Sequence, residues 1–330
     1  MVSLLVAALP VFSQAVVAAP DQDAGTRKQA GKSPVKVFIL AGQSNMEGAA
    51  VVDLTGKDYN GGHGTLVTLM GDPVKGRMFK HLRGADGKWT VRDDVWMTYQ
   101  RENGPLLAGP LGLGFSVYGD QHHFGPELQF GHVIGDATAN QVLLIKTAWG
   151  GKSLDVDFRP PSSGGTVGPY YTKMIAQIRD AVKNLKAEFP GYDGRGVELA
   201  GFGWWHGWND FCDAKAVPAY EQNLVNLIHD VRKDLESPKL PVVIAEFTGP
   251  WLPDAKDLPP AAVAIRKAQE AVAAMPEFKG SVVFVPTRDF VRKPEDSPHP
   301  GHGHHEFGNA ETYFLVGDAM GKGMLGLLRK

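Results

Sequence analysis

Short apolar runs alternate with segments of helical periodicity along this chain, and no other feature restricts its fold as strongly. A short apolar run bounded by turn residues is typical of a buried strand. Strands that alternate with helices are typical of a parallel sheet with helices on both faces. We therefore predict an α/β fold with a doubly wound, five-stranded parallel sheet. The five runs are residues 35–40, 142–147, 197–204, 242–247 and 282–286.

Four segments have the apolar spacing of amphipathic helices. In residues 170–189 the apolar positions include Met174, Ile178 and Leu185, which recur at i, i+3/i+4 spacing. Similar spacing occurs in residues 220–235, 261–275 and 310–328. The first three segments lie between predicted strands, as crossover helices do, and the last follows the final strand.

Residues 48–125 do not follow this alternation. Glycine-containing turns interrupt them, and the runs 88–91 and 95–99 are placed to pair as a hairpin. We interpret 48–125 as one long insertion in a single domain that spans 35–330, lying over the edge of the sheet where ligands bind in such folds, because long excursions of this kind often shape binding pockets.

The N-terminal residues are read separately from the domain. Residues 2–19 carry almost no charge and end in small residues, as a signal peptide does, although a positive leading region is missing. A short membrane anchor or a buried helix is the alternative, and Pro10 argues against both. We predict a signal peptide at 1–20, a polar linker at 21–34, and a protein exported to the periplasm or beyond, without stable membrane insertion after signal removal.

Composition excludes several classes of protein. A formal net charge of -2 argues against a large nucleic-acid surface. The single cysteine, Cys212, excludes an internal disulfide and a cysteine-rich zinc site. Oligomeric state is left open by the sequence.

Three motifs follow predicted strands, where the parallel sheet would bring them to one edge. Ser44 in Gly42-Gln43-Ser44-Asn45 is a candidate nucleophile, and the alternative is a helix cap. Asn209 in Gly207-Trp208-Asn209-Asp210 offers a side-chain N–H donor for an oxyanion, and the alternative is a turn asparagine. In Trp149-Gly150-Gly151-Lys152, a glycine allows close approach of its backbone N–H, and the alternative is a plain turn.

Histidines gather before the last predicted helix. His305 lies four residues before Asn309, the expected N-cap of that helix, and a nearby imidazole would supply the base that a serine nucleophile needs. A metal site built from His299, His302, His304 and His305 is the rival interpretation. The cluster lacks the regular helical spacing of ligand pairs, so we predict no metal and no cofactor.

Together these motifs resemble the four blocks of the SGNH-type hydrolases, and more closely the sialate O-acetylesterase and acetylxylan esterase group of carbohydrate esterases. Gly42-Gln43-Ser44-Asn45-Met46 is similar to the first block, and Gly207-Trp208-Asn209-Asp210 to the third. The resemblance implies the SGNH hydrolase fold, with a flavodoxin-like sheet. It implies that Ser44 is the nucleophile. It also implies an oxyanion hole made by the Ser44 N–H, the N–H of Gly151 or Gly150, with Gly151 preferred, and the Asn209 side chain.

The same resemblance gives two candidates each for the catalytic base and the catalytic acid. The spacing Asp296-Ser297-Pro298-His299 is similar to the Asp-x-x-His of many members, whereas His305 fits the family's distance from histidine to final helix better. We predict His305 as the base, with His299 as the alternative. Some related esterases use a glutamate at a strand end, which here implies Glu246 as the acid, with Asp296 as the alternative.

The resemblance implies a serine esterase that removes O-acetyl groups from a carbohydrate through an acetyl-enzyme. We predict that Trp149, Trp205, Trp208 and His206 contact the sugar; His206 stands where related sequences often have glutamine. One alternative is a non-catalytic carbohydrate-binding protein on an esterase scaffold. Another is an esterase or lipase of other acyl esters, although the sequence shows no long apolar lid segment.

Overall fold

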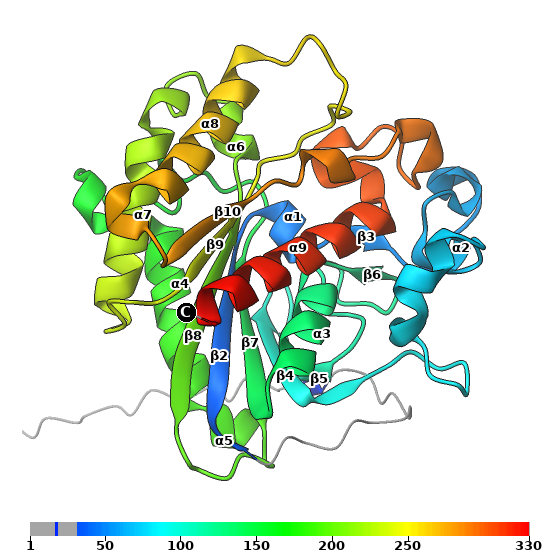
Figure 1. Cartoon of the computed structure of the whole chain (residues 1–330), viewed down its shortest axis with the longest axis horizontal. Coiled ribbons are helices and arrows are strands. Elements are labelled where there is room, and N and C mark those ends of the chain that lie inside the picture. Colours follow the sequence, from blue (N-terminus) through cyan, green and yellow to red (C-terminus); the bar gives the residue numbers. More distant parts are fainter. Residues whose placement is uncertain (1–16, 19–31, 330) are drawn as a thin grey trace, which may run out of the picture.

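A computed structural model describes residues 17–18 and 32–329 of the chain, and in this part an eight-stranded sheet forms the centre of the molecule (Figure 1). A separate two-stranded sheet pairs β3 (Ala50–Val51) with β6 (His123–Phe124). The strand order in the main sheet is β1-β5-β4-β7-β2-β8-β9-β10. These strands are β1 (Val17–Ala18), β2 (Lys32–Gly42), β4 (Arg92–Gln100), β5 (Leu106–Leu111), β7 (Asn140–Ala148), β8 (Val197–Trp205), β9 (Val242–Ala245) and β10 (Val282–Val285).

The doubly wound parallel arrangement is confirmed, but the predicted number of strands is too low. The five predicted runs are β2, β7, β8, β9 and β10, all paired in parallel. Their spatial order is second, first, third, fourth and fifth in the chain, which is the flavodoxin-like order. Beyond β7 the sheet continues with β4, parallel to β7, and with β5, antiparallel to β4.

The interpretation of 48–125 as an insertion is therefore partly wrong. β4 and β5 form the hairpin, with Thr98 opposite Ala108, and both strands belong to the main sheet. The predicted hairpin joined 88–91 to 95–99, because Gly109 and Pro110 hide the strand signal of β5. The earlier part of the segment does lie over the site edge, since the Tyr59 ring packs 4.8 Å from the His299 ring.

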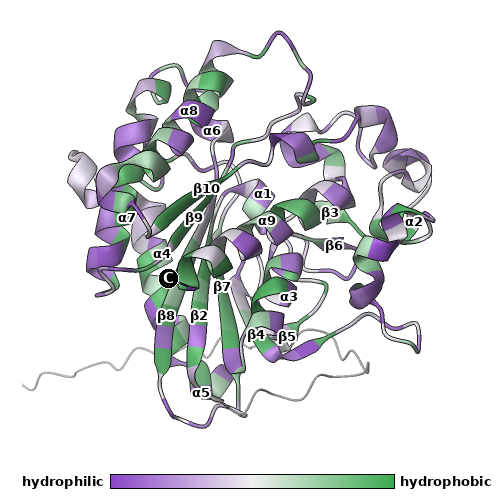
Figure 2. Ribbon diagram, in the orientation of Figure 1, coloured by the Kyte–Doolittle hydropathy of each residue, from purple (hydrophilic) through white to green (hydrophobic). Residues whose placement is uncertain are grey.

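Helices cover both faces of the sheet, as predicted. On β2, Val37 and Ile39 pack in the core under α4 (Pro169–Lys183), α7 (Tyr220–Asp234) and α8 (Pro260–Ala274). Phe38 and Leu40 point to the opposite face, under α3 (Glu127–Ala137) and α9 (Ala310–Leu328). Figure 2 shows the central strands as mostly hydrophobic between helices of mixed character. Each large apolar side chain buried in this way contributes about 1.5–3 kcal/mol.

The four predicted helices are present, and α3 is an addition. The segment 170–189 divides at Asn184 into α4 and α5 (Leu185–Glu188). Glycines at 131 and 135 weaken the helical signal of α3. Short elements complete the fold: α1 (Ser44–Glu47), η1 (Lys57–Gly62), α2 (Leu66–Met70), η2 (Lys75–Leu82), η3 (Pro161–Ser163), α6 (Trp208–Phe211), η4 (Val217–Ala219), η5 (Pro276–Phe278), η6 (Arg288–Phe290), η7 (Pro294–Asp296) and η8 (Gly303–Gly308).

Most of the predicted signal peptide and linker lies outside the described residues. The two residues of β1 fall within 1–20, and β2 begins at Lys32, within the predicted linker. Among the helices of the described segments, none has the length and apolarity needed to cross a bilayer.

A fully buried ion pair joins β7 to α3 beneath the site edge. The Lys146 Nζ lies 2.7 Å from Glu127 Oε2, and neither side chain is exposed. The same Nζ donates to the carbonyl oxygens of Glu47 at 2.8 Å and Phe115 at 2.7 Å. Burial lowers the pKa of Lys146 and raises the pKa of Glu127, and the ion pair opposes both shifts. The pair therefore fixes α1 to the sheet through a group that has no access to water.

Replacing Lys146 by methionine should destabilise the protein by about 3–5 kcal/mol, because Glu127 is left buried without its cation. The surface pair of Lys36 and Glu198, at 2.5 Å, supplies the matched control. Lys36→Met should cost about 0–1 kcal/mol. Urea unfolding of both variants measures the free energies. Equal losses in the two variants would contradict a special role for the buried pair.

Candidate active site

Ser44 lies in the turn directly after the central strand β2. Gly42 ends the strand with φ +153°, and a Cβ there would lie 2.2 Å from the carbonyl oxygen of Trp205, so only glycine fits. The N-cap of α1 is Gln43 and not Ser44. The Ser44 residue is partly exposed. The alternative role of Ser44 as a helix cap is therefore wrong.

The strand order brings the three predicted motifs to this edge. β2 lies between β7 and β8, so the turn of Ser44 lies between the turns that follow those strands. A Cβ on Gly150 would lie 3.5 Å from the Cβ of Ser44. Asn209 lies in α6, just beyond the end of β8. The carboxyl edge of a doubly wound sheet is where ligands bind in such folds.

Gln43 connects the Ser44 turn to the Asn209 turn. Its Nε2 donates to Asn209 Oδ1 at 3.3 Å, and its Oε1 accepts from the Gly207 N–H at 3.1 Å. Because Asn209 Oδ1 is an acceptor here, Asn209 Nδ2 remains as a donor for another group. Sequence reasoning missed this role of Gln43, although its place between Gly42 and Ser44 marked it as part of the motif.

Glu47 positions the glycine pair after β7. The Gly150 N–H donates to the Glu47 carboxylate, and Glu47 Oε1 accepts from the Tyr99 hydroxyl at 2.7 Å. Burial raises the pKa of Glu47, and these hydrogen bonds oppose the shift. Gly151 has φ +71° and open space where a Cβ would lie. In the described part of the chain its N–H has no hydrogen-bond partner. This geometry supports Gly151, and not Gly150, as the backbone donor.

His206 and Asp210 fix the rest of the glycine turn to the end of β8. His206 Nε2 lies 2.9 Å from the Lys152 carbonyl oxygen, and its Nδ1 lies 3.2 Å from the Tyr220 hydroxyl. The Asp210 carboxylate accepts from the Leu154 N–H at 2.7 Å. Burial lowers the pKa of His206 to about 4, so the ring is neutral and Nε2–H is the donor to the carbonyl.

Three of the four residues predicted to bind substrate are buried. His206 is 2% exposed, Trp205 2% and Trp149 0%. The Trp205 indole N–H donates to the carbonyl oxygen of Glu246, which is buried, and the Trp149 indole N–H donates to that of Gln100, which is partly exposed. Side chains without accessible surface cannot stack on a sugar, so the predicted roles of Trp149, Trp205 and His206 are corrected to structural ones.

Trp208 is partly exposed and belongs to an aromatic group at the site edge. Its ring lies 6.5 Å from the Trp251 ring, with 25° between the planes, and 5.8 Å from the His304 ring. Phe211 packs 5.3 Å from the Trp251 ring on the same side. Trp251 lies in the loop after β9, next to Pro250. Sequence reasoning missed it, because nothing except its residue type distinguished it from other loop residues.

The histidine loop contains His305 as a half-buried residue of η8. Burial lowers its pKa to about 4, and charge repulsion from His304, His302 and His299 adds to the shift. At neutral pH the imidazole is therefore uncharged, which is the form that a general base needs. His299 also has a lowered pKa, first because of burial.

The loop is fixed at its C-terminal end by Asn309. As predicted, Asn309 is the N-cap of α9, and its Oδ1 accepts from the N–H of Glu311 at 3.0 Å. Its Nδ2 donates to the carbonyl oxygen of Asp296 at 3.3 Å and to Ser297 Oγ at 3.0 Å. One side chain therefore begins the helix and closes the loop.

The hydroxyl of Tyr313 connects this loop to the nucleophile turn. It lies 2.7 Å from Asn45 Oδ1 and 3.2 Å from the carbonyl oxygen of His305. Asn45 is the residue after Ser44, so the Tyr313 side chain links the turn that holds Ser44 to the backbone of His305. This connection favours His305 over His299 as the base.

The structure gives Glu246 other partners than the predicted histidine. Its Oε2 accepts from the N–H groups of Thr287 and Arg288, both at 3.0 Å, and its Oε1 lies 2.6 Å from Arg288 Nη2. Within the described segments no interaction joins its carboxylate to His305. The prediction of Glu246 as the catalytic acid is therefore corrected: it ties the end of β9 to the loop after β10.

The alternative acid, Asp296, is exposed in η7. Its carboxylate makes no hydrogen bond or ion pair with any other described residue. Among the residues that the structure describes, no group of three or more histidine, cysteine, aspartate or glutamate side chains is arranged to hold a metal ion.

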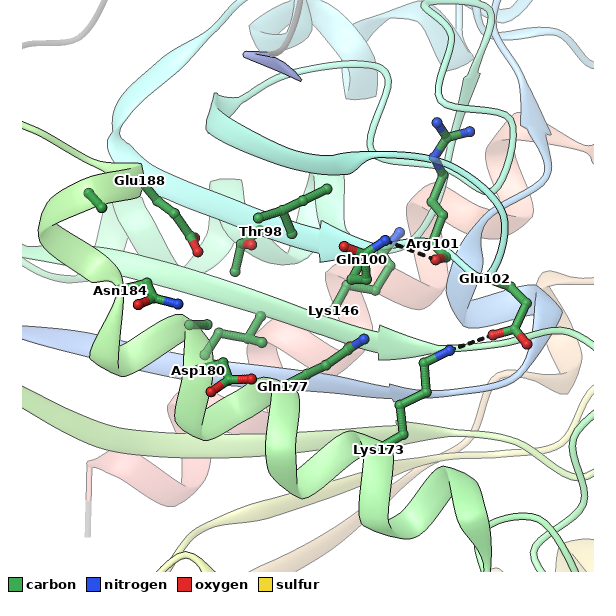
Figure 3. Close-up of a pocket in the computed structure, with 14 residues that line it drawn as sticks. Thr98, Gln100, Arg101, Glu102, Lys146, Lys173, Gln177, Asp180, Asn184 and Glu188 are labelled. Atoms are coloured by element: carbon green, nitrogen blue, oxygen red, sulfur yellow. Dashed lines mark hydrogen bonds and ion pairs between the residues drawn. The ribbon is translucent and has the colours of Figure 1, made fainter. Parts of the chain in front are cut away.

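A cavity of about 630 Å³ lies beside the site, between β4, β7 and α4 (Figure 3). None of the predicted catalytic residues lines it. Lys173 on its wall pairs with Glu102 at 2.5 Å and lies 4.6 Å from the centre of the Trp149 ring. Lys173 is thus a contact between the cavity wall and Trp149, the residue before Gly150.

Comparison with known proteins places this chain in a family. A family model described as "Carbohydrate esterase, sialic acid-specific acetylesterase" matches residues 34–310. Among solved structures, a protein from Arabidopsis thaliana is 15% identical, with a TM-score of 0.55 over 89% of this chain and 98% of that chain. NanS is also 15% identical, with a TM-score of 0.52 over the same shares, 89% and 98%. These two likenesses show a shared fold, and no curated protein sequence matches the chain.

The family match covers most of the chain and agrees with the resemblance carried by the Ser44 and Asn209 motifs. This protein belongs to the carbohydrate esterase family of sialic acid-specific acetylesterases.

Proposed function

We propose that this protein is a serine esterase that removes O-acetyl groups from a carbohydrate through an acetyl-enzyme intermediate. The observation that carries the proposal is the bond from Gln43, the residue before the partly exposed Ser44, to Asn209 Oδ1, which leaves Asn209 Nδ2 without a partner among the described residues. A free amide donor next to a strand-end serine is what an oxyanion hole requires. We further propose export, on the basis of the uncharged residues 2–19.

In the proposed reaction, Ser44 Oγ attacks the acetyl carbon while the neutral His305 imidazole takes the hydroxyl proton. The carbonyl oxygen becomes an oxyanion that receives hydrogen bonds from the N–H groups of Ser44 and Gly151 and from Asn209 Nδ2. The C–O bond to the sugar then breaks, and the sugar oxygen takes the proton from His305. Water attacks the acetyl-enzyme, again giving a proton to His305, and acetate leaves as that proton returns to Ser44 Oγ.

The substrate class follows from the aromatic group beside the site. Trp208 and Trp251 are both partly exposed and nearly parallel, at 25°. Flat rings of this kind can pack against the apolar face of a sugar. Trp208 is the residue before Asn209, so a sugar on this surface lies next to the proposed oxyanion hole.

A non-catalytic carbohydrate-binding protein is the second candidate. It is favoured by one observation: in the described part of the chain, neither Glu246 nor Asp296 contacts the His305 imidazole. Hydrolysis of p-nitrophenyl acetate separates the two candidates, because a binding protein would not release p-nitrophenol above the background rate.

The proposed function is tested by Ser44→Ala. Loss of the nucleophile should lower kcat by a factor on the order of 10⁶, while the fold stays intact. Acetate release from a panel of acetylated glycans, together with p-nitrophenyl acetate turnover, measures the effect. Ser162→Ala is the matched control, since Ser162 is an exposed residue of η3 whose hydroxyl donates to Asp230 of α7, and it should keep full activity. Wild-type turnover by a folded Ser44→Ala variant would refute the proposal.

Asn209→Ala should lower kcat by about 10²–10³ and leave KM nearly unchanged, because the donor acts on charge present only in the transition state. Gln43→Ala should lower kcat in the same direction but less, since it frees the Asn209 amide to rotate. Steady-state kinetics on an acetyl ester give both constants. An increase in KM alone would assign Asn209 to ground-state binding.

The pH profile should show its acidic limit near pH 4. His305 works only as the uncharged base, and its lowered pKa of about 4 keeps it uncharged down to that pH. kcat/KM, which reports the free enzyme, should therefore be nearly flat from about pH 8 to pH 5 and fall as the pH drops through 4. Samples returned to neutral pH check for acid unfolding. A limit near 6.5, the ordinary value of histidine, would mean that the base is an unshifted imidazole.

A further inference from the structure

A buried polar cluster lies behind the proposed Ser44 and His305 and takes no direct part in the proposed reaction. Its members are Asn45, Thr248, Glu306 and Tyr313, all 9% exposed or less. They come from α1, the loop after β9, η8 and α9. A buried network of polar side chains fixes one local geometry when its hydrogen bonds are made, so we ask what this cluster positions.

Glu306 is the acceptor at the centre of the cluster. Its Oε1 accepts from Asn45 Nδ2 at 3.2 Å and from the Thr248 hydroxyl. Asn45 Oδ1 in turn accepts from the Tyr313 hydroxyl, which also reaches the carbonyl oxygen of His305. Asn45, the neighbour of Ser44, is therefore connected to His305 in two ways. The Tyr313 hydroxyl links it to the His305 carbonyl oxygen, and its own amide bonds Glu306, the residue after His305.

The backbone around Glu306 needs this support. Glu306 has φ +51° and Phe307 has φ +56°, a conformation that residues other than glycine rarely adopt. Two such residues in succession reverse the chain after His305. The consequence is that His305 is partly exposed at the site, while Glu306 is completely buried beneath it.

We propose that Glu306 is the positioning residue of His305, acting as a hydrogen-bond acceptor for Asn45 and Thr248 and not as a carboxylate that contacts the imidazole. The inference rests on the proposed function, in which His305 is the base.

Burial of Glu306 agrees with this role. It raises the pKa of Glu306 to about 8, against the opposing effects of the Thr248 hydroxyl and the Gly249 N–H. The side chain is thus mostly uncharged at neutral pH. The nearby Arg266 guanidinium donates to the carbonyl oxygens of Phe247 and Thr248.

The experiment compares Glu306→Gln with Glu306→Leu. Glutamine keeps a neutral acceptor oxygen, so kcat for p-nitrophenyl acetate should stay within about threefold of wild type. Leucine removes the acceptor, and misplacement of the base should lower kcat about 10²-fold with little change in KM. Glu311→Gln is the matched control: Glu311 is a buried carboxylate in the first turn of α9, paired with Lys75 and Arg292, and its replacement should leave kcat unchanged.

A second readout does not depend on catalysis. The NMR titration of the His305 ring should give a low pKa in wild type and in Glu306→Gln, and a pKa closer to 6.5 in Glu306→Leu, because the freed loop exposes the imidazole. Should Glu306→Leu fail to fold by circular dichroism, Thr248→Val and Asn45→Ala each remove one donor to Glu306 and should give smaller shifts in the same direction.

Two outcomes would overturn the inference. Loss of activity in a folded Glu306→Gln variant as severe as in Glu306→Leu would show that the negative charge matters. An unchanged kcat and an unchanged His305 titration in the folded Glu306→Leu variant would show that Glu306 does not position the loop. Absence of serine-dependent hydrolysis in wild type, with the titration shift still present, would instead reject the proposed function and keep the positioning role.

Discussion

The amide of Gln43 is the interaction on which the arrangement of this site depends. It connects the turns that follow β2 and β8. At this point Gly42 and Trp205 approach so closely that a Cβ on residue 42 would lie 2.2 Å from the Trp205 carbonyl oxygen. One side chain bonds both the backbone of Gly207 and the side chain of Asn209. Donors held in place before a reaction cost no reorganisation during it, and this is the main source of electrostatic catalysis in enzymes. The position of Ser44 relative to Asn209 is therefore a property of the fold.

Behind this edge, buried polar groups hold the turns and the short helix that carry the site. Glu47 fixes the Gly150 turn, and the Lys146–Glu127 pair fixes α1. Buried charges are costly to desolvate and bring little net stability, but they specify one geometry when every partner is present. The site is thus stiff where the proposed donors lie, and its stiffness comes from a few named hydrogen bonds.

The sequence predicted the parts of the fold that depend on local periodicity. The runs at β2, β7, β8, β9 and β10 and the helix at 310–328 were visible because their apolar spacing is regular. β4 was visible as an apolar run as well, but its partner was misjudged, since strand pairing joins residues distant in the chain. No single-sequence pattern encodes such a pairing.

Side-chain roles were harder to predict than positions. Motif order correctly placed Ser44, Gly150-Gly151 and Asn209 at one edge. It did not distinguish a tryptophan that faces the core, such as Trp149, from one that faces the site, such as Trp208, because exposure depends on packing. Glu246 was misassigned for a related reason: a carboxylate at a strand end can reach either the next loop or the site, and Arg288 decides between them. Gln43 and Glu306 carried no chemical signal of their own.

The double role of Asn309 makes the histidine loop and the start of α9 depend on one side chain. Its side chain closes the histidine loop on Asp296 and Ser297 while it also begins α9. Between these anchors the loop is also bonded within itself, from the His299 N–H to the Phe307 carbonyl oxygen and from the Phe307 N–H to the His302 carbonyl oxygen. Because the Asn309 side chain anchors both elements, its loss would loosen the histidine loop and the first turn of α9 together.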